Sequence, residues 1–503
     1  MARQKSEDRT VPKDRRKPVQ TRAVEQRGGG KAIPVDERTQ QLELFPGTAE
    51  VPKPGAKDGT IASATMEEVT KRLRQAFQKV ASNKGAAGPD GKSIDDVRAH
   101  LDELVPELSR ELLEGTYRPG AIRRVWIPKS GGGQRGLGIP DVVDRMVQEA
   151  VRAVLEPLYE PTFHDGSHGF RPGRSCHTAI ERARQYVDEG YEWVVDIDLE
   201  KFFDKVNHQR LMARLAERVS DRSLLVTIGR MLKAQIVLPD GVVVSNDEGV
   251  PQGGPLSPLL SNIVLDELDR ELARRGHRFV RYADDCNVYV RSQRAGERVM
   301  ESIVRFIERR LRLKVNSAKS AVARPSERHF VGFRLERKPE DGEVEVLLSK
   351  RSKERIDARL RELTPRGWGQ SLRDCIRQIN AYLEGWLGFF GVCTAGVEYT
   401  LRGLDAHIRR RLRAIQLAHW KTKRTRALRL IRLGVKPLTA WRTVYDGRKS
   451  LWALSHTAAV NRGLRNAYFA ERGLVSLVQQ WRTAHEHIAA PAQLGWCWNV
   501  SRS

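Results

Sequence analysis

The sequence predicts an α+β protein in which a region with antiparallel strands is followed by an all-helical region. The stretch from Arg278 to Arg291, RFVRYADDCNVYVR, has β-forming residues on both sides of Asp284-Asp285, where a tight hairpin turn is expected. The segment WVVDIDLEKFFD at 193–204 predicts an apolar strand that runs into a helical segment. From about residue 350 onward the sequence becomes helical and more basic.

Length and charge limit the number of domains and the class of partner. The chain has 503 residues, more than a single core usually supports, so we expect two or three domains. Its 88 Lys and Arg against 63 Asp and Glu give a net charge of +25, which favours nucleic acid as a partner over a membrane. No apolar run reaches the length of a membrane span, so we expect a cytoplasmic, nucleoid-associated protein. The five cysteines form no C-x-x-C pair and indicate neither a disulfide framework nor a zinc site.

The amino-terminal third combines a basic lead with the first ordered elements. Residues 1–60 are rich in Lys, Arg and Pro with few aromatics, and we expect them to be a disordered basic lead. Order is expected to begin near Thr65, which can form a capping box with Glu68 ahead of apolar residues at helical spacing. Residues 122–145 predict two strands joined by a flexible glycine loop at 131–133.

We expect further carboxylates to lie close to the Asp284-Asp285 turn. Asp196 and Asp198 belong to the strand predicted within 193–204, which can pair beside the hairpin. An Asp-Asp pair alone is most often an ordinary hairpin turn, in which Asp bonds its own backbone. Three carboxylates from two neighbouring strands form an all-oxygen site that suits Mg²⁺. Two such ions, about 3.5–4 Å apart, activate an attacking hydroxyl and stabilise the leaving oxygen of a phosphoryl displacement, which is the chemistry of a polymerase.

Two acidic motifs resemble those of reverse transcriptases. YADD at 282–285 resembles the Tyr-X-Asp-Asp motif, and DLEKFFD at 198–204 resembles the first acidic motif of that family. The family places an aromatic residue five positions after the catalytic Asp, which fits Asp198 with Phe203, whereas Asp196 would put Lys201 there. The resemblance therefore implies Asp198, Asp284 and Asp285 as the catalytic and metal-binding set, with Asp196 as a structural neighbour. Phe203 is then expected to exclude a ribose 2′-hydroxyl.

The same resemblance suggests residues that bind the substrates. Lys129 and Arg135 lie where the fingers of the family contact the incoming triphosphate, although both fit solvated hairpin charges as well. Gln252, in the family-specific triplet Pro251-Gln252-Gly253, is expected to contact template or nucleotide. Lys319 aligns with a polymerase lysine that protonates the departing pyrophosphate, and an exposed surface lysine is its alternative interpretation.

A further loop carries basic candidates, and a further strand extends the resemblance. Arg171 and Arg174, in the loop HGFRPGRSCHTAI at 168–180 that leads to a helix near Ser175, are candidates for contacts to the template backbone. The segment HFVGFRLE at 329–336 resembles the primer-grip hairpin of reverse transcriptases.

The helical region is unusually basic between Leu401 and Lys436, with twelve Lys and Arg against one acid, Asp405. An apolar stripe along the helix near 404–415 leaves some arginines pointing away from the core. We expect this surface to bind RNA phosphates. Its candidate residues are Arg409, Arg410, Arg413, Lys421, Lys423 and Arg424.

The segments INAYLEGWLGFF at 379–390 and HWKTKRTRALRLIRLGV at 419–435 resemble the maturase, or thumb, domain of group II intron proteins. The matches run from about 65 to 435, so the chain resembles bacterial group II intron-encoded reverse transcriptases. Many relatives end in a zinc-supported His-Asn-His endonuclease, whereas the tail here has only Cys497, so we expect no second-strand cleavage by this chain.

The resemblance implies a right-hand polymerase fold with fingers, palm and an all-helical thumb. After the lead at 1–60, we expect an N-terminal extension and fingers at 61–195 and a palm at 196–345. A thumb/maturase domain at 346–435 and a helical nucleic-acid-binding tail at 436–503 complete the predicted organisation.

The implied activity is that of an RNA-directed DNA polymerase and intron maturase. It implies two Mg²⁺ ions, with Mn²⁺ as an alternative, and deoxynucleoside triphosphates as substrates. Expected macromolecular partners are intron RNA, an RNA template and a DNA primer or target, and the oligomeric state stays open. Two other functions are compatible with the sequence: a splicing cofactor that does not need polymerase activity, and a domesticated reverse transcriptase in phage defence or DNA repair.

Overall fold

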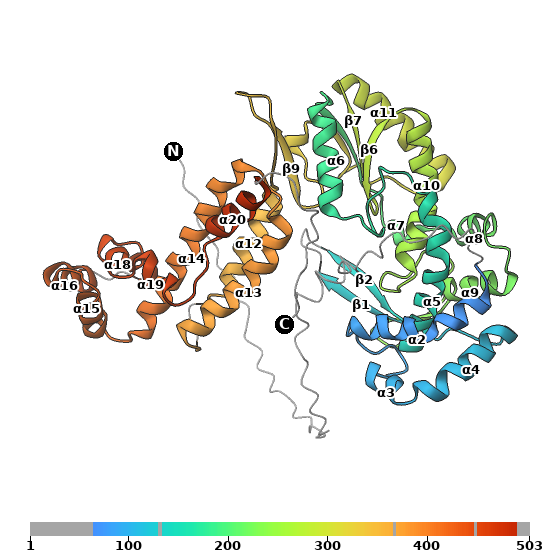
Figure 1. Ribbon diagram of the computed structural model, residues 1–503, viewed down its shortest axis with the longest axis horizontal. Helices are drawn as coiled ribbons and strands as arrows, with labels where there is room; N and C mark the ends of the chain where they lie inside the picture. Colours follow the sequence, from blue (N-terminus) through green and yellow to red (C-terminus); the bar gives the residue numbers. More distant parts are fainter. Residues whose placement is uncertain (1–63, 129–132, 366–368, 447–449, 490–503) are drawn as a thin grey trace, which may run out of the picture. The chain divides into compact units, whose positions relative to one another are not determined.

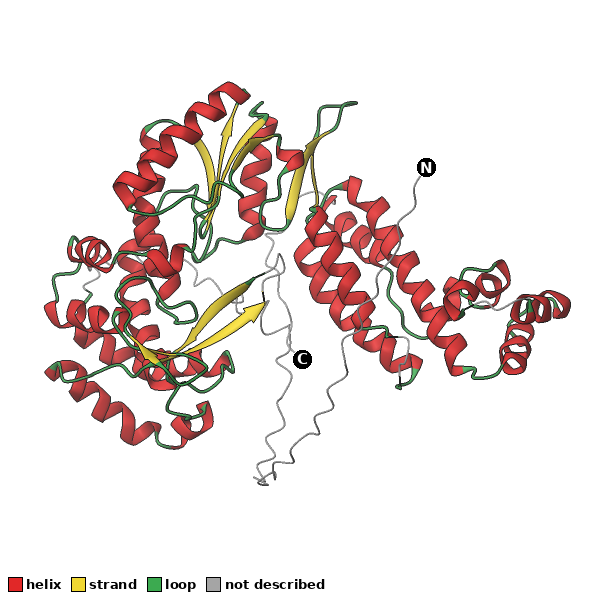
Figure 2. Ribbon diagram, turned by 180° about the vertical axis from the view of Figure 1, so that it is seen from behind, coloured by secondary structure: helices red, strands yellow, loops and turns green. Residues whose placement is uncertain are grey.

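The computed structural model describes residues 64–128, 133–365, 369–446 and 450–489. The predicted basic lead at 1–60 and Lys129 lie outside the described residues. Within these ranges the predicted α+β class is confirmed, because sheets of mostly antiparallel strands precede a helical region (Figures 1 and 2).

The first helices share an apolar core. Thr65 caps the first of them by accepting a hydrogen bond from the backbone N–H of Glu68, at the helix start that the sequence predicts. Apolar residues at helical spacing on this helix, such as Leu73 and Phe77, are buried with residues of the fourth helix, such as Val147 and Val151. The helices are α2 (Met66–Ser82), α3 (Ile94–Ala99), α4 (Leu101–Glu114) and α5 (Val142–Tyr159).

The two strands predicted within 122–145 form an antiparallel hairpin. β1 (Ile122–Pro128) and β2 (Gln134–Ile139) pair from Pro128 opposite Gln134 to Arg123 opposite Ile139. The short strands β4 (Ile236–Val237) and β5 (Val243–Val244) extend this sheet in the order β2-β1-β4-β5.

A second sheet holds the predicted Asp-Asp hairpin. Its strands are β6 (Arg278–Tyr282), β7 (Asp285–Val290), β3 (Trp193–Ile197) and β8 (Ala321–Ala323), in this spatial order. All three strand pairs are antiparallel, and the register places Ile197 opposite Cys286. The two strands of the predicted hairpin and the predicted strand that precedes Asp198 are therefore confirmed, and β3 is the neighbour of β7.

Helices cover both faces of this sheet, so its strands are apolar on both sides (Figure 1). Val194, Val280 and Tyr289 are buried with residues of α6 (Cys176–Asp188). The alternate residues, including Val195, Phe279 and Val288, face α10 (Ser257–Arg274) and α11 (Gln293–Phe306). This two-sided burial gives the Asp-Asp hairpin a rigid base.

The connecting elements are short. Helices α7 (Phe202–Lys205), α8 (His208–Ala216) and α9 (Arg222–Leu232) follow β3, and a five-residue π-helix, Ile307–Leu311, continues α11.

The segment predicted to resemble a primer grip forms β9 (Phe333–Arg337), which pairs antiparallel with β10 (Val344–Leu348).

Helices make up the rest of the described chain. The apolar stripe predicted within α14 is buried, as Leu404, Ile408, Leu412 and Ile415 show. Asp405, the one acid of this basic stretch, accepts hydrogen bonds from the hydroxyl of Ser476 and the backbone N–H of Leu477 at the start of α20. The helices are α12 (Lys350–Glu362), α13 (Leu372–Phe390), α14 (Glu398–His419), α15 (Lys423–Arg432), α16 (Pro437–Tyr445), α17 (Leu451–Leu454), α18 (Ala458–Gly463), α19 (Asn466–Ala470) and α20 (Leu477–Ala489). In the described ranges, every helix is too short or too polar to cross a membrane.

Candidate active site

The turn between β6 and β7 places two carboxylates at the end of the hairpin. Tyr282 pairs with Asp285, so only Ala283 and Asp284 form the connection. Ala283 has φ +55°, a left-handed conformation that suits a two-residue hairpin but is unfavourable for a residue with a Cβ. Asp284 therefore occupies the tip, and Asp285 is the first residue of β7.

Asp198 follows β3 and lies beside this turn, since β3 and β7 are paired up to Ile197 and Cys286. Its backbone is held by the segment that precedes β8. The N–H of Asp198 donates to the hydroxyl of Ser320 over 3.0 Å, and its carbonyl accepts from the N–H of Asn316 over 2.8 Å. A third carboxylate is thus fixed next to the Asp284-Asp285 pair.

Loss of hydration and the negative charges of neighbouring carboxylates raise the pKa values of Asp284 and Asp285. Asp285 is exposed at the start of β7, yet loss of hydration around its carboxyl raises its pKa to about 7, and the negative charges of Asp284, Asp196 and Asp198 act in the same direction. Burial also raises the pKa of Asp284, and the charge of Asp198 adds to this rise while Arg135 and Arg281 oppose it. The site therefore concentrates negative charge.

The donor set fits a hard divalent cation, although the side chains do not yet enclose one. Among the described residues, no three carboxylate, histidine or cysteine side chains are gathered tightly enough to bind a metal ion as they stand. Asp198, Asp284 and Asp285 offer only oxygen donors, which suits Mg²⁺. A cation between them would offset the negative charges that add to the rise in the pKa of Asp285.

Two of the predicted basic residues lie within electrostatic reach of the carboxylates. The ammonium of Lys319 is 3.6 Å from Oδ2 of Asp198 and is largely exposed. The guanidinium of Arg135, exposed on β2, lowers the pKa of Asp284 through its charge. Lys129, the third predicted basic residue, lies outside the described residues.

Phe203 belongs to α7 and Gln252 to the loop before α10, and backbone hydrogen bonds join these two segments to each other and to the first sheet. Phe203 is half-buried and packs edge-on against Phe202, with ring centroids 5.2 Å apart. Its carbonyl accepts a hydrogen bond of 2.6 Å from the N–H of Val250, two residues before Gln252. The carbonyl of Gln252 in turn accepts a 2.6 Å hydrogen bond from Gly138 of β2. This chain of backbone contacts fixes the predicted nucleotide-contacting loop.

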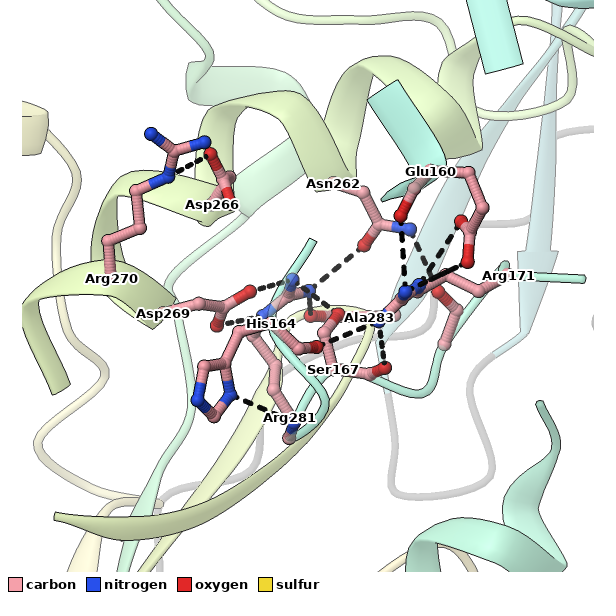
Figure 3. Close-up of polar contacts among 12 residues, drawn as sticks. Glu160, His164, Ser167, Arg171, Asn262, Asp266, Asp269, Arg270, Arg281 and Ala283 are labelled. Carbon is pink, nitrogen blue, oxygen red and sulfur yellow. Dashed lines mark hydrogen bonds and ion pairs between the residues drawn. The ribbon is translucent and has the colours of Figure 1, made fainter. Parts of the chain in front are cut away.

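Other candidates are already engaged by protein groups. Asp196 accepts a hydrogen bond of 2.8 Å from Nε of Arg328, so it is half-buried in an ion pair beside the site. Arg171 was expected to reach the template backbone, and this expectation is wrong. Its guanidinium is buried and donates to Glu160 and to the carbonyls of His164 and Ser167 (Figure 3).

Arg174 is likewise paired within the chain. Its guanidinium donates to the carboxylate of Asp165 over 2.6 Å and to the carbonyl of the same residue over 2.8 Å. The positive charge at this loop is therefore largely neutralised by a neighbouring acid.

The six basic candidates of the helical region differ in exposure. Lys421, Lys423 and Arg424 are exposed at the start of α15, and the ammonium of Lys423 lies 5.5 Å from the ring centroid of Tyr445. Arg409 and Arg410 are half-buried on α14. Arg413 is half-buried as well, and its Nε donates to the carbonyl of Leu464 over 2.9 Å.

Sequence reasoning missed a buried arginine behind the turn. Arg281 precedes Tyr282 on β6 and is fully buried against Asp269 of α10 (Figure 3). A signal was present, because strand alternation puts Arg281 on the same face as the apolar Phe279. A charged residue at a core position of a strand indicates a buried partner.

Comparison with known proteins identifies two family models along the chain. Residues 127–335 match the reverse transcriptase (RNA-dependent DNA polymerase) family, and residues 353–433 match the group II intron maturase-specific domain. Protein YkfC of Escherichia coli (strain K12) is 36% identical over 307 residues, which cover 53% of this chain and 80% of that protein.

The group II intron-encoded protein LtrA of Lactococcus lactis subsp. cremoris is 40% identical over 196 residues. This match covers 39% of the present chain but only 32% of LtrA, so the chain spans about a third of that relative. A chain of a solved partial Cas6-RT-Cas1–Cas2 complex is 22% identical with a TM-score of 0.31, covering 48% of this chain and 42% of that chain, a similarity too low to bear on function. Both family models and the match to LtrA agree: the chain belongs to the family of group II intron-encoded reverse transcriptases and maturases, and it is an RNA-directed DNA polymerase.

Proposed function

We propose that this chain synthesises cDNA on an RNA template by two-metal phosphoryl transfer, with Asp198, Asp284 and Asp285 as the metal-binding carboxylates. The observation that carries the proposal is the strand register, which brings Asp198 at the end of β3 beside Asp284 and Asp285 at the start of the neighbouring strand β7. Two Mg²⁺ ions, or Mn²⁺ in their place, would activate the primer 3′-hydroxyl and stabilise the leaving oxygen.

The remaining site residues have roles that follow from their positions. Arg135 binds the triphosphate, because its guanidinium is exposed within electrostatic reach of Asp284. Lys319 donates a proton toward the departing pyrophosphate from beside Asp198. The ring of Phe203 rejects a ribose 2′-hydroxyl, and Gln252 contacts template or nucleotide. Lys129 belongs to the same triphosphate-binding group by sequence alone.

Replacing Asp284 with Asn tests the polymerase proposal. We expect Mg²⁺-dependent primer extension on an RNA template to fall to background, because the amide cannot supply the negative charge that two cations require. Asp95→Asn, at an exposed position on α3, is the matched control and should extend the primer at the wild-type rate. Extension by Asp284→Asn at the wild-type rate would remove the assignment of the metal set.

We also propose that the helical region binds intron RNA, assists its splicing and supports retrohoming. Lys421, Lys423 and Arg424 form an exposed basic cluster at the start of α15, within the maturase-specific match at 353–433. Arg409 and Arg410 on α14 add charge to the same region. Arg413 contributes less, since its guanidinium is occupied by the carbonyl of Leu464.

A splicing assay separates the two activities. Asp284→Asn should retain splicing of the intron transcript, whereas joint replacement of Lys421, Lys423 and Arg424 by Gln should lose it while primer extension on a short template persists. Loss of both activities in the triple variant with the fold intact would contradict separate sites. The proposed domain division follows these roles, with fingers at 61–195, palm at 196–345, thumb/maturase at 346–435 and a nucleic-acid-binding tail at 436–503.

A further inference from the structure

Arg281 uses its whole hydrogen-bonding capacity inside the protein. Its guanidinium is fully buried and has five N–H groups. Asp269 accepts two hydrogen bonds, 2.7 Å from Nε and 2.5 Å from Nη2. Asn262 Oδ1 at 3.0 Å, the hydroxyl of Ser167 at 2.7 Å and the carbonyl of Ala283 at 2.8 Å accept the other three (Figure 3). Each donor therefore has one acceptor.

These contacts join three segments that are far apart in the sequence. Asn262 and Asp269 belong to α10, Ser167 belongs to the loop before α6, and Ala283 belongs to the catalytic turn (Figure 3). The backbone reinforces the junction, because the N–H of Arg281 donates to Gly166 and its carbonyl accepts from His168, each over 2.8 Å. The turn is thus anchored to elements that do not carry the catalytic carboxylates.

The anchored carbonyl belongs to a residue in an unfavourable conformation. Ala283 has φ +55°, and such strain persists only where the surroundings determine it. The loop before α6 also lies very close to the turn, because a Cβ on Gly169 would be 2.2 Å from the backbone nitrogen of Ala283. Asp284 and Asp285 follow Ala283 directly, so the direction of the Ala283 peptide sets where their carboxylates point.

We propose that Arg281 is a positioning residue that fixes the Ala283 carbonyl and thereby orients Asp284 and Asp285 toward the divalent ions and the primer 3′ end. This inference rests on the proposed two-metal function. Its basis is the geometry of the guanidinium rather than its charge, since Asp269 neutralises that charge in an ion pair with no exposed surface. A lysine would keep the charge but has only three donors and no fork, so it cannot reach all four partner residues.

Arg281→Lys is the direct test, and it is read out in two ways. We expect kcat for nucleotide incorporation to fall about 10- to 100-fold, with the KM for nucleotide and the Kd for primer–template near wild-type values. We also expect Mn²⁺ binding to the enzyme–primer–template complex, titrated by electron paramagnetic resonance without nucleotide, to weaken about tenfold. The matched control is Arg270→Lys, because Arg270 pairs with Asp266 on the same helix without contacting the turn. The control should keep both quantities.

A second variant covers the case in which lysine disrupts the buried pair. In Arg281→Met/Asp269→Leu the ion pair is replaced by apolar side chains, a change that often preserves the fold, while the bond to Ala283 is removed. Its circular dichroism and melting curve are measured first, and we expect the same losses of kcat and Mn²⁺ affinity. Either folded variant with wild-type kcat and Mn²⁺ affinity would overturn the role of Arg281.

The failure of this inference differs from a failure of the proposed function. If Arg281 has no positioning role, the wild type binds Mn²⁺, Asp284→Asn does not, and the Arg281 variants bind as the wild type does. If the metal set itself is wrong, Asp284→Asn binds Mn²⁺ as tightly as the wild type.

Discussion

The side chains around Asp198, Asp284 and Asp285 fall into two groups, depending on whether other protein groups already use their hydrogen-bonding capacity. Lys319 and Arg135 are exposed and act on the carboxylates through charge alone. Asp196 and Arg171, in contrast, are held by Arg328 and Glu160. A side chain that keeps free hydrogen-bonding capacity beside a charged cluster can bind substrate, whereas a saturated one supports structure.

Lys319→Ala should slow the chemical step. If its ammonium protonates the departing pyrophosphate, the rate constant of nucleotide incorporation falls by about 10²–10⁴, the usual contribution of a general acid. Rapid-quench measurement of single-nucleotide incorporation gives this rate. Lys314→Ala is the control, because Lys314 lies on the same segment but pairs with Glu200 at 3.4 Å. If Lys319→Ala incorporates nucleotide as fast as Lys314→Ala, Lys319 is an ordinary surface lysine with no role in proton transfer.

Phe203→Ala should admit ribonucleotides. Removing the ring opens space for the 2′-hydroxyl, and we expect the preference for deoxynucleotides to fall roughly 10- to 100-fold. The ratio of kcat/KM for a deoxynucleotide and the matching ribonucleotide measures this preference. Phe203→Tyr keeps the bulk and should keep the ratio, and an unchanged ratio in Phe203→Ala would mean that another group excludes the hydroxyl.

His168 should make the stability of the fold depend on pH. Burial lowers its pKa to about 4, and the charges of Arg174 and Arg171 act in the same direction. Between pH 4 and the ordinary pKa of 6.5 the unfolded chain binds a proton that the folded chain does not, so stability falls as the pH falls through this window. At pH 5 this amounts to about 2 kcal/mol relative to pH 7.5.

The comparison with His168→Asn isolates this contribution. The amide can replace the contact between Nδ1 of His168 and the hydroxyl of Thr178, but it does not titrate. Urea unfolding at pH 7.5 and 5.0 should show a smaller difference for the variant than for the wild type. The same difference in both proteins would exclude His168 as the cause.

The elements around the site show what the sequence could and could not predict. The hairpin at 278–290 and the strand at 193–197 follow from local residue preference and were predictable, as was the start of α2 at Thr65. The cluster around Arg281 depends on α10 and on the loop before α6, which only the tertiary fold brings to β6. The contact of Arg413 with Leu464, 51 residues later, was hidden for the same reason.

The substitution Gly249→Ala tests whether nucleotide binding requires the close approach of the loop after β5 to α7. Its φ is +93°, and a Cβ there would lie 2.8 Å from the carbonyl of Phe203. Gly249→Ala should displace Phe203 and Gln252 together, so the KM for nucleotide rises, by about tenfold if the displacement costs about 1.4 kcal/mol of binding.

Gly241→Ala provides the matched control for Gly249→Ala. Gly241 has φ +85°, but a Cβ there would meet nothing within 4 Å. Both variants should lose about 1–2 kcal/mol of stability from the left-handed backbone, and only Gly249→Ala should change the KM. A wild-type KM in Gly249→Ala would show that the close approach is not needed for nucleotide binding.

Charge is distributed unevenly over the whole molecule. The chain carries a net charge of +25, yet the turn at Asp284 and Asp285 concentrates carboxylates. Exposed cations at the start of α15 belong to the maturase-specific match, which is separate in sequence from the reverse transcriptase match at 127–335. Long-range attraction of a polyanion and local metal chemistry can therefore be changed independently.

The salt dependence of RNA binding tests this separation. Each phosphate contact releases counterions, so log K falls with log salt concentration by about 0.7 to 0.9 per contact. Replacing Lys421, Lys423 and Arg424 by Gln should lower the magnitude of the slope by about 2 to 3 if each binds one phosphate. Filter binding of the intron transcript over a series of salt concentrations measures the slope. Arg377→Gln, Arg74→Gln and Arg98→Gln together remove three exposed cations paired with acids elsewhere, and this control should leave the slope unchanged. An equal loss of slope in both triple variants would mean that overall charge, rather than the α15 cluster, attracts the RNA.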